Sequence, residues 1–69
     1  MNNKTLKAFT PNGGTATVTN YGGGGATNLS QSEFDAYQKA GLVANPANGS
    51  KIEEAKAILE TAGFEVYWK

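Results

Sequence analysis

Four consecutive glycines, Gly22–Gly25, stand a few residues before an expected helix, an arrangement that often binds phosphate. The run fits neither G-x-x-x-x-G-K-[ST] nor G-x-G-x-x-G, the two glycine patterns that hold nucleotide phosphates. No lysine or arginine occurs between Lys7 and Lys39, and the carboxylate of Glu33 already occupies the first turn of that helix. We therefore expect residues 22–29 to form a flexible connector, which can become ordered when a partner binds.

The polar residues offer few routes to catalysis. Without histidine or cysteine, the chain lacks the usual zinc and copper ligands, and a serine nucleophile would have only a lysine or a carboxylate as its base. All the acidic residues have ordinary structural explanations, such as helix starts and solvated helix faces; they are Glu33, Asp35, Glu53, Glu54, Glu60 and Glu65. We expect no enzyme, no catalytic residue, no cofactor and no metal site, and a hard-cation site is the alternative left open.

Aromatic residues are more informative, because several fall on one face of an expected sheet. Phe9, Tyr67 and Tyr21 project to the same side as Lys7 and Lys69. Such a face can stack bases, form a protein interface, or simply stay exposed in a thin domain. We expect a protein interface, and free strand edges offer a second route by strand addition. The expected partner-binding residues are Lys7, Phe9, Tyr21, Gly22, Gly23, Gly24, Gly25, Tyr67 and Lys69.

The charge balance argues against nucleic acid as the partner. Six lysines and no arginine balance six acidic residues, so the net charge is zero, whereas phosphate contacts usually go with a basic surplus. No apolar run is long enough to span a membrane, and no segment resembles a signal peptide. We expect a complete, cytoplasmic protein that binds no membrane and no small-molecule cofactor.

The length bounds the fold. The chain has 69 residues, enough for one domain over 1–69. A core of this size rarely supplies more than about 3–5 kcal/mol, so proteins this small often rely on disulfides, metals or association. Because cysteine is absent, either close local packing or a homo-oligomer has to stabilise this fold.

A hairpin signal, Asn12-Gly13, separates two segments rich in residues that favour strands. A two-residue loop would pair Phe9 with Ala16, and a three-residue loop would pair Ala8 with Val18. We prefer the three-residue loop, because register follows the apolar pattern. That loop puts the apolar residues of both strands on one face: Leu6, Ala8, Ala16 and Val18.

A helix is expected over 30–41. Ser30 and Glu33 have the spacing of a capping box, in which each side chain accepts a hydrogen bond from the backbone of the other residue. Gly41 is expected to end the helix, because glycine adopts the left-handed conformation that commonly follows a last helical turn.

A loop over 42–50 is expected to lead into a second helix over 51–62. The capping-box pattern repeats at Ser50, and Gly63 ends the helix. A final strand over 64–69 alternates apolar with polar residues. The apolar stripe of the second helix comprises Ile52, Ala55, Ile58, Leu59 and Ala62.

This C-terminal part resembles the helix-then-strand half of PASTA repeats. The residues that match the repeat are Pro46, Gly49, Ala55, Leu59, Gly63, Phe64 and Val66. The match covers less than half of the chain, and the hairpin, the glycine run and the first helix have no counterpart. The resemblance therefore implies only the local helix–strand arrangement and no cell-wall binding.

These signals predict a small single α+β domain of β-β-α-α-β order. A hairpin over 5–21 and the C-terminal strand form a three-stranded sheet with two helices on one face, and the order of its strands stays open.

We expect a binding protein that acts by protein contact. Short chains of this kind are similar to accessory proteins of phages and mobile elements, which suggests an accessory factor or an inhibitor. A single-stranded nucleic-acid binder and a self-assembling structural subunit remain the alternatives.

Overall fold

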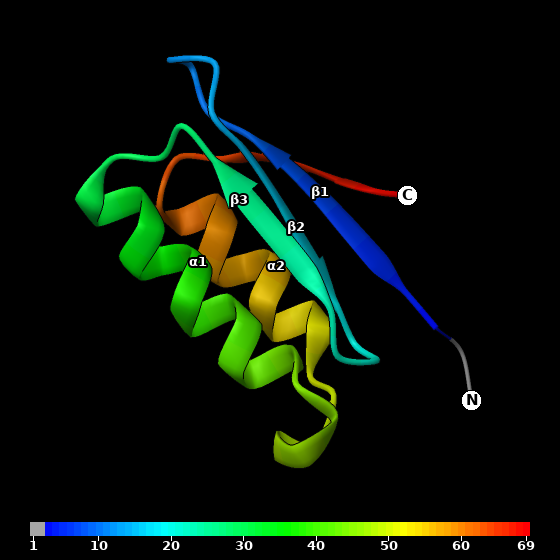
Figure 1. Ribbon diagram of the computed structural model, residues 1–69. Helices are drawn as coiled ribbons and strands as arrows, with labels where there is room; N and C mark the ends of the chain where they lie inside the picture. The colour runs from blue at the N-terminus through cyan, green and yellow to red at the C-terminus, as the bar shows by residue number, and fades with distance from the viewer. Residues whose placement is uncertain (1–2) are drawn as a thin grey trace.

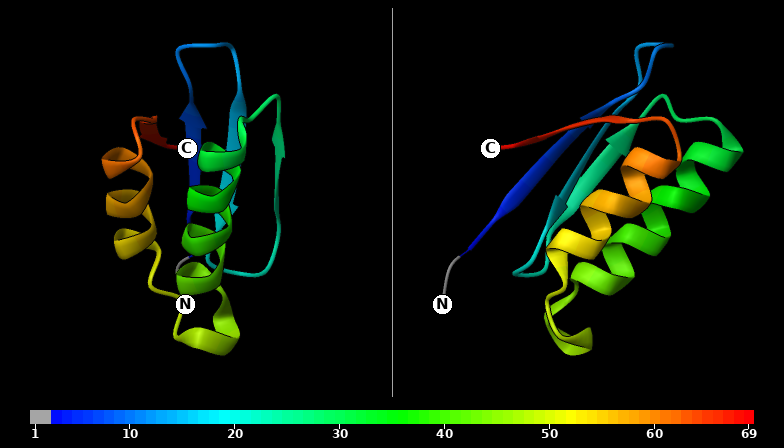
Figure 2. Two further views of the ribbon diagram at one scale, coloured as in Figure 1. Left: turned by 90° about the vertical axis from the view of Figure 1, so that its left-hand side faces the viewer. Right: turned by 180° about the vertical axis from the view of Figure 1, so that it is seen from behind.

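One antiparallel sheet with two helices on a single face makes up the structure, a computed structural model that describes residues 3–69 (Figure 1). The strand order across the sheet is β3-β2-β1-β4. Figure 2 shows both helices on one side of the sheet and the other side free of them. In chain order the elements are β1 (Thr5–Phe9), β2 (Thr15–Thr19), β3 (Gly24–Thr27), α1 (Gln31–Ala44), the 3-10 helix η1 (Pro46–Asn48), α2 (Ile52–Thr61) and β4 (Glu65–Trp68).

The predicted α+β class is confirmed, but the sheet has four strands where three were expected. The additional strand, β3, lies inside the segment predicted to be a flexible connector, where Gly24 pairs with Val18 and Gly25 with Thr17. Gly24 has φ +143°, and a Cβ atom there would collide with the carbonyl oxygen of Thr17. Glycine is therefore required at position 24. Because glycine is depleted in strands, the sequence pattern does not predict a strand here.

The hairpin register differs from both predicted registers. Leu6 lies opposite Val18 and Ala8 opposite Ala16, which leaves a loop of residues 10–14. That loop is closed by Thr10, whose N–H donates to the carbonyl oxygen of Gly14 at 2.9 Å. The predicted apolar face is confirmed, since all four residues are buried. The preferred register differs from the observed one by two residues, a shift that keeps every side chain on its face, so the apolar pattern cannot detect it.

The capping box that starts α1 is confirmed. The N–H of Glu33 donates to the hydroxyl oxygen of Ser30 at 3.3 Å, and the N–H of Ser30 donates to a carboxylate oxygen of Glu33 at 2.9 Å. The predicted end at Gly41 is wrong, because α1 continues to Ala44, which is fully buried. Burial of this last turn against the sheet outweighs the cost of a glycine inside the helix, about 1 kcal/mol. Pro46 then disfavours further helix.

The start of α2 also differs from the prediction. Ser50 has a positive φ of 55° and its hydroxyl donates to the carbonyl oxygen of Asn20 at 3.2 Å, so it does not cap the helix. The helix starts at Ile52 without a side-chain cap. Its predicted end is confirmed: Gly63 has φ +98°, and the following N–H donates back to the carbonyl oxygen of Leu59 at 3.1 Å. The predicted loop 42–50 contains the last turn of α1 and η1.

The core lies between the sheet and the two helices. Five of its ten buried apolar residues are alanines, so the helices approach the sheet closely and the core is thin. The buried apolar residues are Leu6, Ala8, Ala16, Val18, Ala40, Ala44, Ile52, Ala55, Leu59 and Phe64.

The position of the last strand, which the sequence left open, is at the edge beside β1. Glu65 lies opposite Phe9 and Trp68 opposite Leu6. The N–H of Lys69 continues the ladder by donating to the carbonyl oxygen of Thr5 at 2.9 Å. The first and last strands therefore meet side by side, and the alternation of β4 brings Tyr67 to the same face as Lys7.

Candidate functional site

The side of the sheet opposite the helices, here called the open sheet face, carries the aromatic residues that the sequence singled out. Strand alternation and cross-strand register place Lys7 and Phe9 of β1 on this face with Tyr67 of β4. Polar and small residues fill the adjoining strands, and the right-hand view of Figure 2 shows that neither helix crosses this side. By register these neighbours are Thr5, Thr15, Thr17, Gly25, Thr27 and Glu65.

The centre of the candidate site is an aromatic pair. The ring centroids of Phe9 and Tyr67 are 5.9 Å apart with an interplanar angle of 59°, which is a favourable tilted contact between neighbouring strands. Phe9 remains 41% exposed and Tyr67 52% exposed, although both rings are large and mostly apolar. The two strands therefore present a preformed aromatic surface to solvent.

A carboxylate holds the phenol of this pair. The hydroxyl of Tyr67 donates to a carboxylate oxygen of Glu65 at 2.6 Å. This hydrogen bond, together with the negative charge of Glu65, raises the pKa of Tyr67 above its ordinary value. The hydrogen bond therefore disfavours ionisation of the phenol and orients its hydroxyl on the open sheet face.

Tyr21 extends the aromatic surface toward the start of β1. Its hydroxyl and the hydroxyl of Thr5 are 3.0 Å apart, and the side chain is 49% exposed. Lys69 lies opposite Thr5, and the carbonyl oxygen of Thr5 accepts a hydrogen bond from the N–H of Lys69. The structure thus brings five of the predicted partner-binding residues to one face. We call this set the aromatic stripe: Lys7, Phe9, Tyr21, Tyr67 and Lys69.

The glycine run lies apart from the aromatic pair. Gly22 and Gly23 form the turn that follows Tyr21, and the hydroxyl of Thr19 donates to the carbonyl oxygen of Gly23 at 2.7 Å. Gly24 and Gly25 belong to β3, which β2 and β1 separate from β4. The run is therefore beside Tyr21 but distant from Tyr67, and much of it is structured without a partner.

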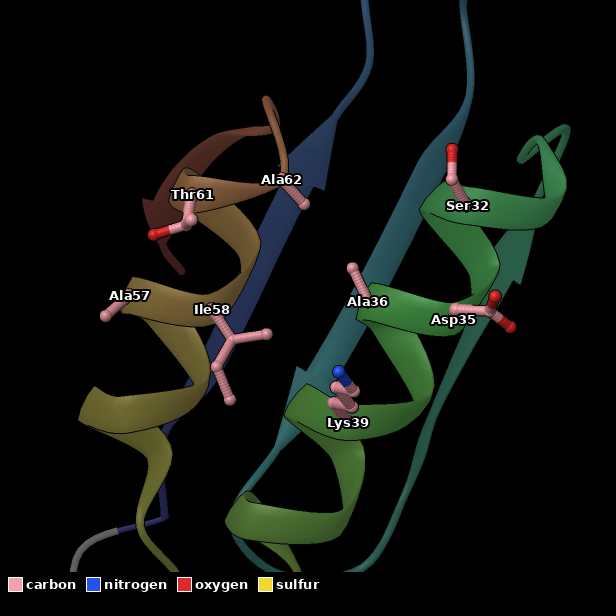
Figure 3. A pocket seen from close by; sticks show the side chains of 8 residues that line it. All are labelled: Ser32, Asp35, Ala36, Lys39, Ala57, Ile58, Thr61 and Ala62. Atoms are coloured by element: carbon pink, nitrogen blue, oxygen red, sulfur yellow. The ribbon is translucent and has the colours of Figure 1, made fainter.

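A groove between the helices is a feature that sequence analysis missed. Figure 3 shows Ile58 of α2, and Ala62 directly after this helix, pointing toward α1, while Ala36 lies on the side of α1 that faces α2. The groove has a volume of about 540 Å³ and is open to solvent. Small residues on the facing sides of both helices are the signal that could have indicated it. Its lining residues are Ser32, Asp35, Ala36, Lys39, Ala57, Ile58, Thr61 and Ala62.

Trp68 is also more exposed than its apolar pattern suggested. The ammonium group of Lys4 lies 5.3 Å from the Trp68 ring centroid, within the range of a cation–π contact. The same ammonium group is 3.7 Å from a carboxylate oxygen of Glu53 on α2. Lys4 therefore connects the end of β4 to the start of α2 on the helix side of the sheet.

Neither a metal cluster nor a membrane-spanning helix occurs in the part of the chain that the structure describes. Among residues 3–69, acidic side chains do not gather in groups of three that could hold a metal ion. No helix in the same range is long and apolar enough to cross a bilayer.

No protein-family model, curated protein or solved structure matches this chain. The resemblance to PASTA repeats therefore extends no further than the local residues that carry it.

Proposed function

We propose that this protein is a non-enzymatic binding module that recognises a protein partner through the aromatic stripe. The observation that supports this most directly is the exposed pair of Phe9 and Tyr67, in ring contact on the side of the sheet away from the helices. Tyrosine and phenylalanine are enriched in the cores of protein interfaces, where few residues supply most of the binding energy.

Rigid strands make this surface suited to binding. The rings sit on paired strands, and hydrogen bonds hold the phenols of Tyr67 and Tyr21. Less side-chain entropy is therefore lost on association, which strengthens binding without extra contacts. Lys7 and Lys69 flank the rings, so the partner that fits best presents apolar side chains with carboxylates at the margin.

The proposed role in the cell follows from this mode of action. A module of this size changes a larger protein by occupying part of its surface. We propose that the protein is an accessory factor or inhibitor, encoded by a phage or mobile element, that acts in the cytoplasm. Its small size and lack of cysteine and histidine support this.

Single-stranded nucleic acid is the second candidate partner. One observation favours it: Lys7 lies opposite Tyr67 and two residues before Phe9 on the same face of β1, so a cation lies beside two rings on which bases can stack. The zero net charge and the carboxylate of Glu65 on the same face weigh against it. Binding to a polyanion weakens steeply with salt, whereas an apolar protein interface responds little.

A capture experiment with matched variants tests the proposal. Tagged wild-type protein, Phe9→Ala, Tyr67→Ala and the control Leu42→Ala are incubated with lysate of the source organism, with and without nuclease. Leu42 is 61% exposed on α1, so its variant removes an exposed apolar side chain from the helix side. We expect wild type and control to capture the same protein, and each aromatic variant to capture at least about tenfold less. Circular dichroism verifies that all four chains are folded.

Three results would contradict the proposed function. Equal capture by the aromatic variants, with loss in Leu42→Ala, would move the interface to the helices. Capture that nuclease abolishes, together with salt-sensitive binding of an oligothymidine, would make nucleic acid the partner. A wild-type eluate that contains only the bait would favour self-assembly.

A further inference from the structure

The outer edge of β4 has unpaired backbone groups. Lys69 donates its N–H to Thr5 at 2.9 Å, so this residue faces β1. Because bonded residues alternate along an antiparallel ladder, Glu65 and Tyr67 also face β1, whereas the N–H and C=O groups of Val66 and Trp68 point outward. Within residues 3–69, no strand lies beyond β4. Such an edge is a template for another strand.

We propose that this edge pairs with β4 of a second copy of the chain, antiparallel about a two-fold axis at Tyr67. In this register Val66 lies opposite the partner's Trp68, and both residues use their outward N–H and C=O groups. Glu65 lies opposite the partner's Lys69 on the open sheet face. The two-fold axis repeats each of these pairs, so the sheet continues from one copy into the other.

Charge complementarity selects this register. In a two-fold antiparallel pair, directly opposite residues point to the same face of the sheet. The open sheet faces of the two copies therefore join only when the two-fold axis passes through a residue; an axis between two residues would join the open face of one copy to the helix side of the other. An axis at Val66 would set Glu65 opposite Tyr67 and leave Lys69 without an opposite charge. An axis at Tyr67 makes two Glu–Lys pairs and brings the two Tyr67 side chains together at a non-hydrogen-bonded position, where cross-strand side chains are closest.

The rest of the structure favours β4 over the opposite edge. β3 (Gly24–Thr27) carries no charged side chain, so nothing there would set a register. Figure 1 shows β4, in red, passing from beside α2 to an end that lies away from both helices. A core in which five of ten residues are alanine also gains from association, as small domains commonly do.

This inference goes beyond the proposed function and stands without it, because it concerns a sheet edge and a second copy. In the dimer, the Phe9–Tyr67 pairs of both copies would lie next to each other on one continuous face.

A disulfide cross-link tests the register directly. The chain has no cysteine, so Tyr67→Cys places a single thiol at the proposed axis. Opposite Cα atoms at a non-hydrogen-bonded position are about 4.5 Å apart, within the range of about 4.4–6.8 Å for disulfides. Under mild oxidation we expect a covalent dimer on non-reducing gels. The control, Thr27→Cys, places its thiol on the exposed edge strand β3 and should remain monomeric.

Charge reversal tests the same register without altering Tyr67. Glu65→Lys alone and Lys69→Glu alone each create two like-charge pairs, and each should weaken association by roughly tenfold in sedimentation velocity. An equal mixture of the two variants restores both Glu–Lys pairs and should dimerise like wild type.

Three outcomes would overturn the inference. The first is a wild-type chain that sediments as a monomer up to about 1 mM. The second is a mixture of charge variants that associates no better than either variant alone. The third is faster cross-linking of Thr27→Cys than of Tyr67→Cys, with circular dichroism showing that both variants are folded.

Discussion

Tyr67 combines three features of the candidate site in one residue. Its ring contacts Phe9 at 5.9 Å, its hydroxyl donates to Glu65, and its backbone lies opposite Lys7. Each contact restrains a different part of the residue, although the ring is half exposed. A partner that binds here meets an ordered surface, which is the condition for strong binding by a small number of residues.

The hydrogen bond to Glu65 gives Tyr67 a measurable pH dependence. The pKa of Tyr67 is raised in the folded state, by the hydrogen bond first and the charge second, so the interaction stabilises the protein fully below the ordinary tyrosine pKa. Its contribution disappears as pH rises through the higher folded pKa. Ultraviolet absorbance of phenolate should therefore show one tyrosine of wild type titrating at higher pH than in Glu65→Ala.

Tyr67→Phe provides the control for that assignment. The high-pH step should be absent from the titration curve of this variant. Indistinguishable curves for wild type and Glu65→Ala would mean that the hydrogen bond is not maintained in solution.

At the level of elements, β3 shows how a strand can form from residues that disfavour strands. Gly24 and Gly25 are adjacent and chemically identical, but their surroundings differ. A Cβ atom at Gly24 would collide with the Thr17 carbonyl oxygen, and φ there is +143°, whereas at Gly25 nothing lies within 4 Å of a Cβ atom. The pairing of β3 with β2 thus depends on the first glycine and tolerates a side chain at the second.

This contrast predicts the stabilities of two matched variants. Gly24→Ala should lower the free energy of unfolding by about 1–3 kcal/mol, because the backbone has to leave a conformation that alanine rarely adopts. Gly25→Ala should be neutral or slightly stabilising, since alanine reduces the entropy of the unfolded chain. Urea unfolding followed by circular dichroism measures both. Equal losses in the two variants would show that β3 does not require this pairing.

The elements also show how far local sequence signals can be trusted. The capping box at Ser30 was predicted correctly, because all its hydrogen bonds lie within one turn. The same pattern at Ser50 failed, because that hydroxyl donates to Asn20, which is distant in sequence. Gly41 failed as a helix end for a similar reason, since burial of the following turn depends on the sheet. Local signals are reliable only where no tertiary contact competes with them.

For the whole molecule, stability rests on a few large buried side chains. Leu59 is fully buried between α2 and the sheet, among several alanines. Leu59→Ala should cost about 2–5 kcal/mol, comparable with the whole stability expected of a domain this small. We expect thermal unfolding to show that this variant is largely unfolded at 37 °C, while Leu42→Ala stays within about 0.5 kcal/mol of wild type. A cooperative transition for Leu59→Ala near that of wild type would place the main stabilisation elsewhere, for example in a dimer.

The candidate site could be predicted in part because sheet faces follow from alternation. Lys7, Phe9 and Tyr67 fall on one face in any register that keeps the apolar residues buried. The contact between Phe9 and Tyr67 could not be predicted, since it requires β4 to pair with β1. The groove between the helices could be indicated only by small residues such as Ala36 and Ala62, because its existence depends on how α1 and α2 pack against each other in three dimensions.

The pairing of the first strand with the last also determines the order in which the molecule can fold. The β1–β2 hairpin and the two helices join neighbouring segments, so they can form early, whereas β4 can pair with β1 only across both helices, which lie between the two strands in the chain. Until this pair forms, β1 has one open edge and an uncovered aromatic ring at Phe9. The folding chain is therefore most prone to mispairing before β4 has paired with β1, and the formation of this pair is the step that covers the edge of β1.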